Sequence, residues 1–274
     1  MEYLNQLFNI ENKVAVLTGG GGILAGEMAK GFLKAHAKVV LLDINEENLK
    51  NKIEQFAEIG GEVIGLKCDV LDEASIKIVH GEIIKKFGRI DVLINAAGGN
   101  MPGATIGLDQ TVFDLKIDQL KKVTDLNLNG TVLPTLIFGK TMAEQKSGSI
   151  INISSMASYR VITRVVGYSA AKAAIDNFTK WMAVELAQKF GNGIRVNAIA
   201  PGFLLTEQNR TLLTNEDGSL TERGKKIIDV TPFKRFGEPD ELIGTIIWLA
   251  SDASKFVTGA IIPIDGGFNV FSGI

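Results

Sequence analysis

Three residues near the middle of the chain have the types and the spacing needed to move a proton. Tyr168 and Lys172 lie four positions apart in the segment YSAAK, so on a helix they project from the same face. A lysine cation beside a phenol favours the phenolate and lowers the tyrosine pKa from about 10, which suits acid or base catalysis. Ser155 ends the apolar run SIINISS and can donate a hydrogen bond to a substrate oxygen. Together they predict proton transfer at a carbonyl or alcohol, whereas a Tyr/Lys pair alone would also fit an ordinary helix surface.

A glycine-rich segment near the N-terminus is suited to a dinucleotide. The run Thr18-GGGGILAG follows a short apolar stretch and opens a helical pattern, the context in which backbone N–H groups approach a pyrophosphate at a helix N-terminus. A tight turn with no ligand is the alternative. Asp43 ends the second apolar stretch, 24 positions after Gly19 (43 − 19 = 24), close to the offset of about 20 at which a carboxylate accepts from ribose hydroxyls. Because an aspartate there repels a 2′-phosphate, NAD is favoured over NADP as the cofactor.

Short apolar stretches alternate with helical patterns along the whole chain. Strands are expected at 13–19, 38–43, 62–70, 91–98, 149–155, 194–202 and 260–267, and helices at 25–36, 46–59, 72–87, 118–146, 167–190 and 238–251. Apolar strands imply burial on both faces, and their alternation with helices implies right-handed crossovers and a parallel sheet. We therefore predict an α/β, Rossmann-type, doubly wound sheet of seven parallel strands in one domain over residues 1–274. The segment 203–232 lacks a clear period and is expected to be a substrate loop or lid, with a plain surface insertion as the alternative.

The carboxyl ends of parallel strands meet at one edge of the sheet, where open sheets bind ligands. The third expected strand ends in Cys68-Asp69-Val70 and the fourth in Asn95-Ala-Ala-Gly98, so both should flank the adenine and its ribose. The residues expected to contact the cofactor from this half of the chain are Gly19, Gly21, Gly22, Ile23, Leu24, Asp43, Asp69, Val70, Asn95, Ala96 and Ala97.

The composition narrows the choice of partners. With 29 basic and 31 acidic residues, the net charge of −2 gives no general attraction to nucleic acid or anionic lipid. The longest apolar runs have strand length, well short of the roughly 20 residues that cross a bilayer, and the first residues do not read as a secretory signal. One cysteine and two histidines are too few soft ligands for zinc, and the lone Cys68 fits a reducing cytoplasm. The expected partner is a small-molecule substrate, with no metal, nucleic acid or membrane.

Several ordered motifs resemble the short-chain dehydrogenase/reductase family over essentially the whole length of the chain. Residues 95–98 (NAAG) are similar to the NNAG motif of that family, and Asn127 in NLNG is similar to the asparagine that holds a water in its proton relay. Ser155, Tyr168 and Lys172 match the remaining members of its catalytic tetrad. The segment of the family that meets the nicotinamide carboxamide is matched by Pro201, Gly202 and Thr206.

The resemblance implies a mechanism and an assembly. A ketone oxygen lies between Ser155 and Tyr168, and Tyr168 donates a proton while the nicotinamide passes hydride to the carbon. Lys172 lowers the tyrosine pKa and holds the nicotinamide ribose, and Asn127 connects the lysine to solvent through water. The reverse reaction oxidises an alcohol. The family also implies a homotetramer.

The glycine turn departs from the family pattern. TGxxxGxG would place glycine at positions 23 and 25, where isoleucine and alanine stand, while Gly22 and Gly26 lie one residue to either side. The resemblance therefore does not fix the pyrophosphate contacts, although four consecutive glycines let the backbone approach closely.

Two loops also resemble the members of this family that interconvert D-mannonate and D-fructuronate. The loop after the fourth strand contains Asn100 and Thr105, and the loop after Ser155 contains Arg160 and Arg164. A polyhydroxy acid needs a cation for its carboxylate and amide or hydroxyl partners for its alcohols, so these four residues, together with Ser155, are the expected substrate contacts. Both arginines could instead be surface or subunit-contact residues.

Two other functions stay open at this point. A dehydrogenase or reductase of a neutral sugar, a polyol or a 3-oxoacyl thioester is the second candidate, and the thioester would favour NADPH, against which Asp43 argues. A non-catalytic nucleotide-binding protein is the candidate from a different class, since a fold alone does not establish turnover. The intact Asn/Ser/Tyr/Lys set favours an NAD-dependent enzyme.

Overall fold

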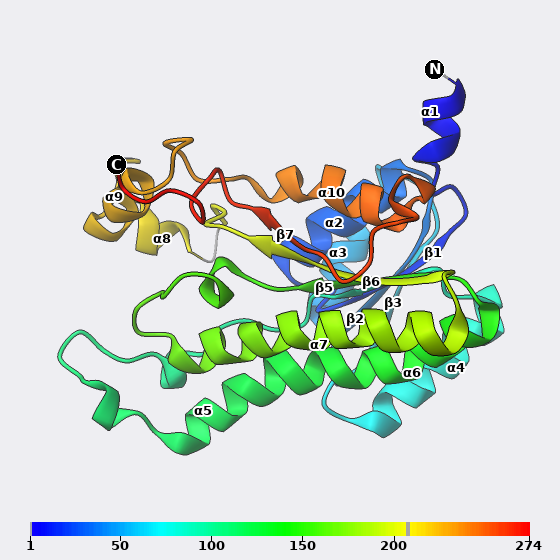
Figure 1. Cartoon of the computed structure of the whole chain (residues 1–274), viewed down its shortest axis with the longest axis horizontal. Helices are drawn as coiled ribbons and strands as arrows, with labels where there is room; N and C mark the ends of the chain where they lie inside the picture. Colours follow the sequence, from blue (N-terminus) through cyan, green and yellow to red (C-terminus); the bar gives the residue numbers. More distant parts are fainter. Residues whose placement is uncertain (1, 207–208) are drawn as a thin grey trace.

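Seven parallel strands form one sheet in the order β3-β2-β1-β4-β5-β6-β7 (Figure 1). The computed structural model describes residues 2–206 and 209–274. The strands are β1(Val14–Thr18), β2(Lys38–Asp43), β3(Val63–Lys67), β4(Val92–Asn95), β5(Gly148–Ile153), β6(Ile194–Pro201) and β7(Ile261–Ile264). From β1 the chain adds strands toward one edge of the sheet, and from β4 it adds them toward the other edge. Open parallel sheets bind ligands at such a switch point, which here lies between β1 and β4. The predicted α/β, Rossmann-type, seven-stranded parallel sheet is confirmed.

Helices cover both faces of this sheet. They are α1(Glu2–Leu7), α2(Ile23–Lys34), α3(Glu46–Phe56), α4(Glu73–Phe87), α5(Ile117–Thr124), α6(Gly130–Gln145), α7(Val166–Phe190), α8(Arg210–Leu213), α9(Glu222–Asp229) and α10(Ile243–Ala250). Figure 1 shows α2, α3 and α10 on one side of the sheet and α4, α6 and α7 on the other. No helix of residues 2–206 and 209–274 combines the length and the apolar character that crossing a bilayer requires.

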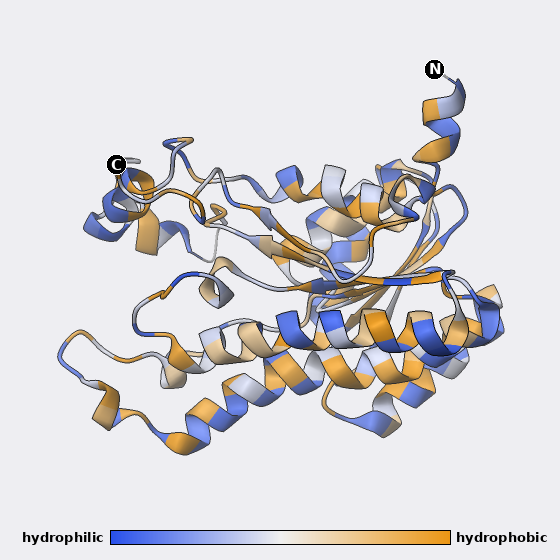
Figure 2. Cartoon of the chain, in the orientation of Figure 1, coloured by the Kyte–Doolittle hydropathy of each residue, from blue (hydrophilic) through white to orange (hydrophobic). Residues whose placement is uncertain are grey.

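The core lies in two layers, one on each face of the sheet. Alternate residues of β1 serve the two layers, because Leu17 packs with Phe32 of α2 while Val16 packs with Phe138 of α6. Figure 2 shows the strands mainly in the hydrophobic colour and the outer helices in mixed colours. Burial on both faces explains why the strands are continuous apolar runs.

Local sequence signals set the helix boundaries. The Asn45 side chain accepts from two backbone N–H groups at the start of α3, and Asp72 caps α4 in the same way. Gly88 ends α4 in the left-handed conformation, with a φ of 73°, which glycine adopts without steric cost. The two N-caps thus start α3 and α4 just after the carboxyl ends of β2 and β3, and Gly88 turns the chain toward the start of β4.

Two predicted elements differ from the structure. The helix expected at 118–146 is interrupted by a π-helical segment, Asp125–Asn129, between α5 and α6. The segment 203–232 is partly helical, since it contains α8 and α9, which pack through the buried Leu213 and Ile227. Residues 207–208 of this segment lie outside the described residues. A π-helical turn is a local insertion that hydrophobic periodicity does not reveal, and such turns are frequent at functional sites.

Candidate active site

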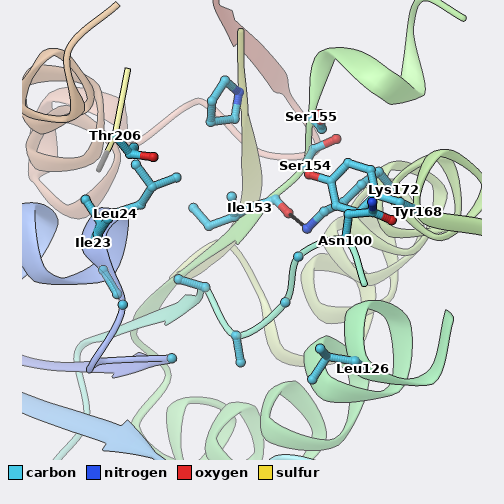
Figure 3. A pocket seen from close by; sticks show the side chains of 18 of the residues that line it. Ile23, Leu24, Asn100, Leu126, Ile153, Ser154, Ser155, Tyr168, Lys172 and Thr206 are labelled. Atoms are coloured by element: carbon cyan, nitrogen blue, oxygen red, sulfur yellow. Dashed lines mark hydrogen bonds between the residues drawn. The ribbon is translucent and has the colours of Figure 1, made fainter. Parts of the chain in front are cut away.

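A cavity of about 830 Å³ runs along the carboxyl edge of the sheet, a volume within the range of cofactor and substrate sites. Most of the residues predicted from the sequence line it. They are Gly19, Gly22, Ile23, Leu24, Asp43, Asp69, Val70, Ala96, Ala97, Asn100, Ser155, Tyr168, Lys172, Pro201, Gly202 and Thr206. Figure 3 shows Ser155, Tyr168, Lys172 and Asn100 at one side of the cavity and Ile23, Leu24 and Thr206 at the other. The folded chain thus joins the glycine turn and the proton-transfer set in one site.

The glycine turn is shaped by close approach between strands β1 and β4. Gly19 has a φ of 66°, and a Cβ there would lie 2.9 Å from backbone atoms of Ala97, so only glycine fits without a shift. The N–H of Gly21 donates to Asp43 Oδ2 at 3.0 Å, and the N–H of Asn45 donates to Oδ1 at 2.9 Å. These bonds hold the carboxylate beside the turn at the end of β2. Gly21 itself supports Asp43 and does not line the cavity.

This half of the cavity fits a dinucleotide. The exposed backbone of the glycine turn leads into the N-terminus of α2, which suits a pyrophosphate. The fixed carboxylate of Asp43 suits a ribose diol. Ala96 and Ala97 line the cavity from the end of β4, with both of their N–H groups donating to Thr18 Oγ1 at 3.1 Å.

Asn95, in contrast, lies below the cavity in the sheet. Its side chain is buried, and Nδ2 donates to Thr135 Oγ1 and to Asn152 Oδ1, both at 2.8 Å. In this position the asparagine joins β4 to β5 and α6. The cavity wall at this strand end is formed by the residues that follow Asn95.

The proton-transfer residues come from β5 and α7. Ser155 follows β5 and caps a short helical turn, because its Oγ accepts from the Ala157 N–H at 3.1 Å, which leaves the hydroxyl proton available for another acceptor. Tyr168 and Lys172 lie one turn apart in the first part of α7. Lys172 Nζ donates to the Ile153 carbonyl oxygen at 2.7 Å, as drawn in Figure 3, and lies 5.5 Å from the centre of the Tyr168 ring.

Burial shifts the pKa values of both residues. The pKa of Tyr168 is raised by desolvation, and its hydrogen-bonding neighbour Ser155 opposes that rise. This corrects the expectation that the lysine lowers the tyrosine pKa in the free protein, because burial penalises the phenolate more strongly. Burial also lowers the pKa of Lys172 to about 8, and the nearby Asp176 carboxylate opposes the fall. A lysine of this kind can exchange a proton near neutral pH.

Asn127 lies in the π-helical turn, directly behind the cavity wall. Its Nδ2 donates to the carbonyl oxygens of Gly99 and Val123, both at 2.8 Å, and its Oδ1 accepts from the Gly99 N–H at 3.0 Å. A Cβ on Gly98 would lie 2.6 Å from Asn127 Oδ1 and 3.7 Å from Lys172 Nζ. The asparagine and the lysine therefore border the same stretch of backbone.

Three predicted substrate contacts do not line the cavity. Thr105 lies beyond Asn100 and accepts from its Nδ2 at 2.6 Å. Arg160 Nη1 donates to the Asn269 carbonyl oxygen at 2.8 Å, and Arg164 Nε donates to the Ile106 carbonyl oxygen at 2.5 Å. Both guanidinium groups tie loops together in this structure, because unpaired carbonyl groups of irregular segments need donors.

The cavity also contains residues that the sequence reasoning missed. Leu126, Met156, Ile162 and Val165 add apolar walls beside the proton-transfer set, and Asn209 and Arg223 reach the cavity from the lid segment 203–232. The absence of a hydrophobic period in segment 203–232 indicated a binding loop, but it did not show which of its side chains face the cavity. Within residues 2–206 and 209–274, no group of three or more His, Cys, Asp or Glu side chains is placed to hold a metal ion.

Comparison with known proteins agrees with the fold and the motifs. Residues 22–269 match the family model described as enoyl-(acyl carrier protein) reductase, of the short-chain alcohol dehydrogenase type. The chain is 43% identical to the uncharacterised oxidoreductase UxuB of Bacillus subtilis, over 97% of this chain and 98% of the relative. It is 34% identical to the 3-oxoacyl-[acyl-carrier-protein] reductase FabG of Thermotoga maritima, over 94% and 98% of the two chains.

A solved structure is similar over nearly the same length. The crystal structure of a candidate D-mannonate oxidoreductase from Haemophilus influenza with bound NAD superposes with a TM-score of 0.90, at 42% identity over 97% of this chain and 98% of that chain. A family match over most of the chain and relatives above 30% identity lead to one conclusion. The chain belongs to the short-chain dehydrogenase/reductase family of oxidoreductases.

Proposed function

We propose that this protein is an NAD(H)-dependent oxidoreductase that interconverts a secondary alcohol and a ketone of a sugar acid, of the D-mannonate/D-fructuronate kind. One observation carries the proposal: a single cavity joins the glycine turn and Asp43 to Ser155, Tyr168 and Lys172. The bound NAD of the similar structure supports the choice of cofactor. The residues present thus fit a dinucleotide with its nicotinamide end toward Tyr168.

The chain's own side chains supply the proton chemistry. With a ketone bound, the hydroxyl groups of Ser155 and Tyr168 both donate to its oxygen, which polarises the carbonyl. Tyr168 then gives its proton to that oxygen as negative charge develops on it. The Lys172 cation stabilises the resulting phenolate. Asn127 supports the path through Lys172 and water by which Tyr168 regains a proton from solvent. When bound, the nicotinamide supplies or accepts the hydride.

A similar structure favours the sugar acid, and the cavity offers a contact for its hydroxyl groups. The similar structure is that of a candidate D-mannonate oxidoreductase, and Asn100 lines the cavity beside the proton-transfer set, where its amide suits a sugar hydroxyl. A 3-oxoacyl thioester is the second candidate, since the Thermotoga maritima relative is a reductase of that class. Asp43 disfavours the NADPH that such a reductase would be expected to use.

We further propose that the enzyme works in the cytoplasm. Cys68 is free and buried, and burial raises the pKa of its thiol to about 11, which suits a structural thiol in a reducing compartment. Cell fractionation with an antibody to the protein would test this.

An NAD(H)-linked screen tests the proposed function. Absorbance of NADH at pH 7 and pH 9 should report oxidation of D-mannonate and reduction of D-fructuronate, with D-gluconate, D-mannitol, xylitol and a 3-oxoacyl thioester measured at equal concentrations. We expect kcat/KM for at least one sugar acid to exceed that for every neutral polyol by more than about tenfold, the effect of one charge-assisted contact. Faster turnover of a neutral polyol or of the thioester would overturn the substrate class. No turnover of any compound by NAD(H) or NADP(H) would favour a non-catalytic protein.

A further inference from the structure

Among residues 2–206 and 209–274, four charged residues line the cavity, and the acidic and basic ones lie at different ends of it. Asp43 ends strand β2 and Asp69 follows strand β3, on the side suited to the adenosine. Lys172 lies at the other end and serves Tyr168. The fourth is Arg223 of the lid helix α9. Among the described residues that line the cavity, Arg223 is the one basic residue without a role in the proposed proton transfer.

The position of Arg223 follows from how α9 is built. Thr221 caps the helix by accepting from the Gly224 N–H at 3.0 Å. A Cβ on Gly224 would lie 2.2 Å from the Leu213 carbonyl oxygen, so the absence of a side chain lets α9 pack closely on the end of α8. Ile227, one turn further, is buried in the same contact. The face beside this packed face carries Arg223 to the cavity.

The neighbouring acidic residue does not neutralise this cation. Glu222 forms an ion pair with Lys225 at 2.9 Å, and no ion pair joins Arg223 to another described residue. An arginine presents several N–H donors in a planar fork that matches both oxygens of a carboxylate. Its environment is therefore suited to an anionic ligand inside the cavity.

The arginines expected from the sequence are engaged elsewhere, because Arg160 and Arg164 donate to loop carbonyl oxygens. We propose that Arg223 recognises the carboxylate of the acid substrate, an assignment that rests on the proposed function. In this arrangement the lid selects acids over neutral polyols by charge, while Ser155 and Tyr168 act on the alcohol or ketone. The pyrophosphate of a bound cofactor would be the other anion within the cavity, and the experiment separates the two.

The test compares Arg223→Gln with Arg223→Lys and with Arg210→Gln. Arg210 is exposed, as Arg223 is, and lies at the start of α8 in the same lid, but it does not line the cavity, so its variant is a matched control for charge loss on the lid. KM for D-mannonate at saturating NAD⁺, KM for NAD⁺ and kcat/KM for D-mannitol are measured at constant ionic strength. Circular dichroism and the Tm show that each variant is folded.

We expect Arg223→Gln to raise KM for D-mannonate about tenfold to a hundredfold, the effect of losing a charge-assisted contact. Arg223→Lys should restore part of this loss, and Arg210→Gln should behave as the unmodified enzyme. KM for NAD⁺ and kcat/KM for D-mannitol should change less than about twofold. A rise in KM for NAD⁺ with D-mannonate unaffected would place the guanidinium at the pyrophosphate, and equal losses on acid and polyol would make it structural. Either result overturns the assignment.

Malonate separates this assignment from the proposed function, because it carries carboxylates but no alcohol to oxidise. Its competitive inhibition of the unmodified enzyme should weaken at least about tenfold in Arg223→Gln. If the screen shows that neutral polyols are the better substrates, the proposed function fails, whatever malonate does. If malonate inhibits both proteins equally while sugar acids remain the best substrates, only the assignment of Arg223 fails.

Discussion

Tyr168 is the residue on which the proposed proton transfer depends. Tyr168→Phe removes the transferable proton and leaves the ring in place, so kcat should fall by at least about a hundredfold. The affinity for NADH should stay within about twofold, because the hydroxyl contributes little to cofactor contact. Steady-state kinetics and a fluorescence titration with NADH measure the two quantities.

Tyr159→Phe is the matched control, since that hydroxyl only reaches the Ile261 carbonyl oxygen at 3.4 Å. A Tyr168→Phe enzyme with most of its rate would show that another group is the acid.

Lys172 should make the stability of the protein depend on pH. Its pKa is lowered from 10.5 to about 8 by burial. Below both values the lysine is charged in the folded and the unfolded chain, so the desolvation penalty is constant. Between the two values the folded chain releases the proton first, so stability rises with pH.

The measurement is the free energy of unfolding in urea for the unmodified protein and for Lys172→Met. We expect the difference, unmodified minus variant, to increase by about 1.5 kcal/mol between roughly pH 8 and pH 9.5. Titrating groups that do not interact with Lys172 cancel in this difference. A difference that stays constant over this range would mean that the folded lysine keeps an ordinary pKa.

The glycine turn and the end of β2 act as one unit in choosing the cofactor. Asp43 is fixed by the N–H groups of Gly21 and Asn45, so its charge stays where a 2′-phosphate would lie. We expect kcat/KM for NAD⁺ to exceed that for NADP⁺ by at least about tenfold, from repulsion between like charges. Asp43→Asn should lower the ratio of kcat/KM for NAD⁺ to kcat/KM for NADP⁺.

The control is Glu46→Gln, which removes an exposed acid paired with Lys67 outside the cavity and should leave this ratio unchanged. A preference of the unmodified enzyme for NADP⁺ would contradict the prediction.

Elements with a regular period could be predicted from the sequence, and the structure brings residues at their ends together in one cavity. Ser155, Tyr168 and Asp43 were predicted because each follows a strand or repeats on a helix, and these patterns set where a residue points. Arg164 was predicted at the substrate from a loop. In the structure its φ is 76°, and its backbone and side chain both pair with Ile106. Such loop-to-loop pairing depends on backbone groups, which sequence patterns do not describe.

At the scale of the whole molecule, the alternation of apolar strands and helices predicted the parallel sheet and the side on which the cavity lies. The internal arrangement of the lid could not be predicted in this way. It depends on Gly224 allowing α9 to meet the end of α8 and on a small cluster around Leu213 and Phe236 that is separate from the two main core layers. A cluster this small leaves no periodic signal, because only a few residues from short helices contribute to it.

The outer face of α6 and α7 is the surface on which we predict assembly. The two helices run side by side below the sheet (Figure 1), and apolar side chains on this face are exposed: Leu136 by 53%, Trp181 by 59% and Val184 by 58%. Tryptophan is enriched in buried interfaces. We predict that this exposed set forms one of the interfaces of the homotetramer that the family resemblance implies.

Light scattering coupled to size exclusion should give a mass of four times the 29.5 kDa chain. Trp181→Glu places a charge in the predicted interface, where burial without a partner is unfavourable, so it should shift the population to smaller species, most strongly at low protein concentration. Ile78→Glu is the control, because Ile78 is an exposed apolar residue on α4 and not on α6 or α7. The affinity for NADH should remain in the dissociated protein, since the cavity is lined within one chain. A monomeric unmodified protein, or a Trp181→Glu variant with the same mass as the Ile78→Glu control, would exclude this face as the interface.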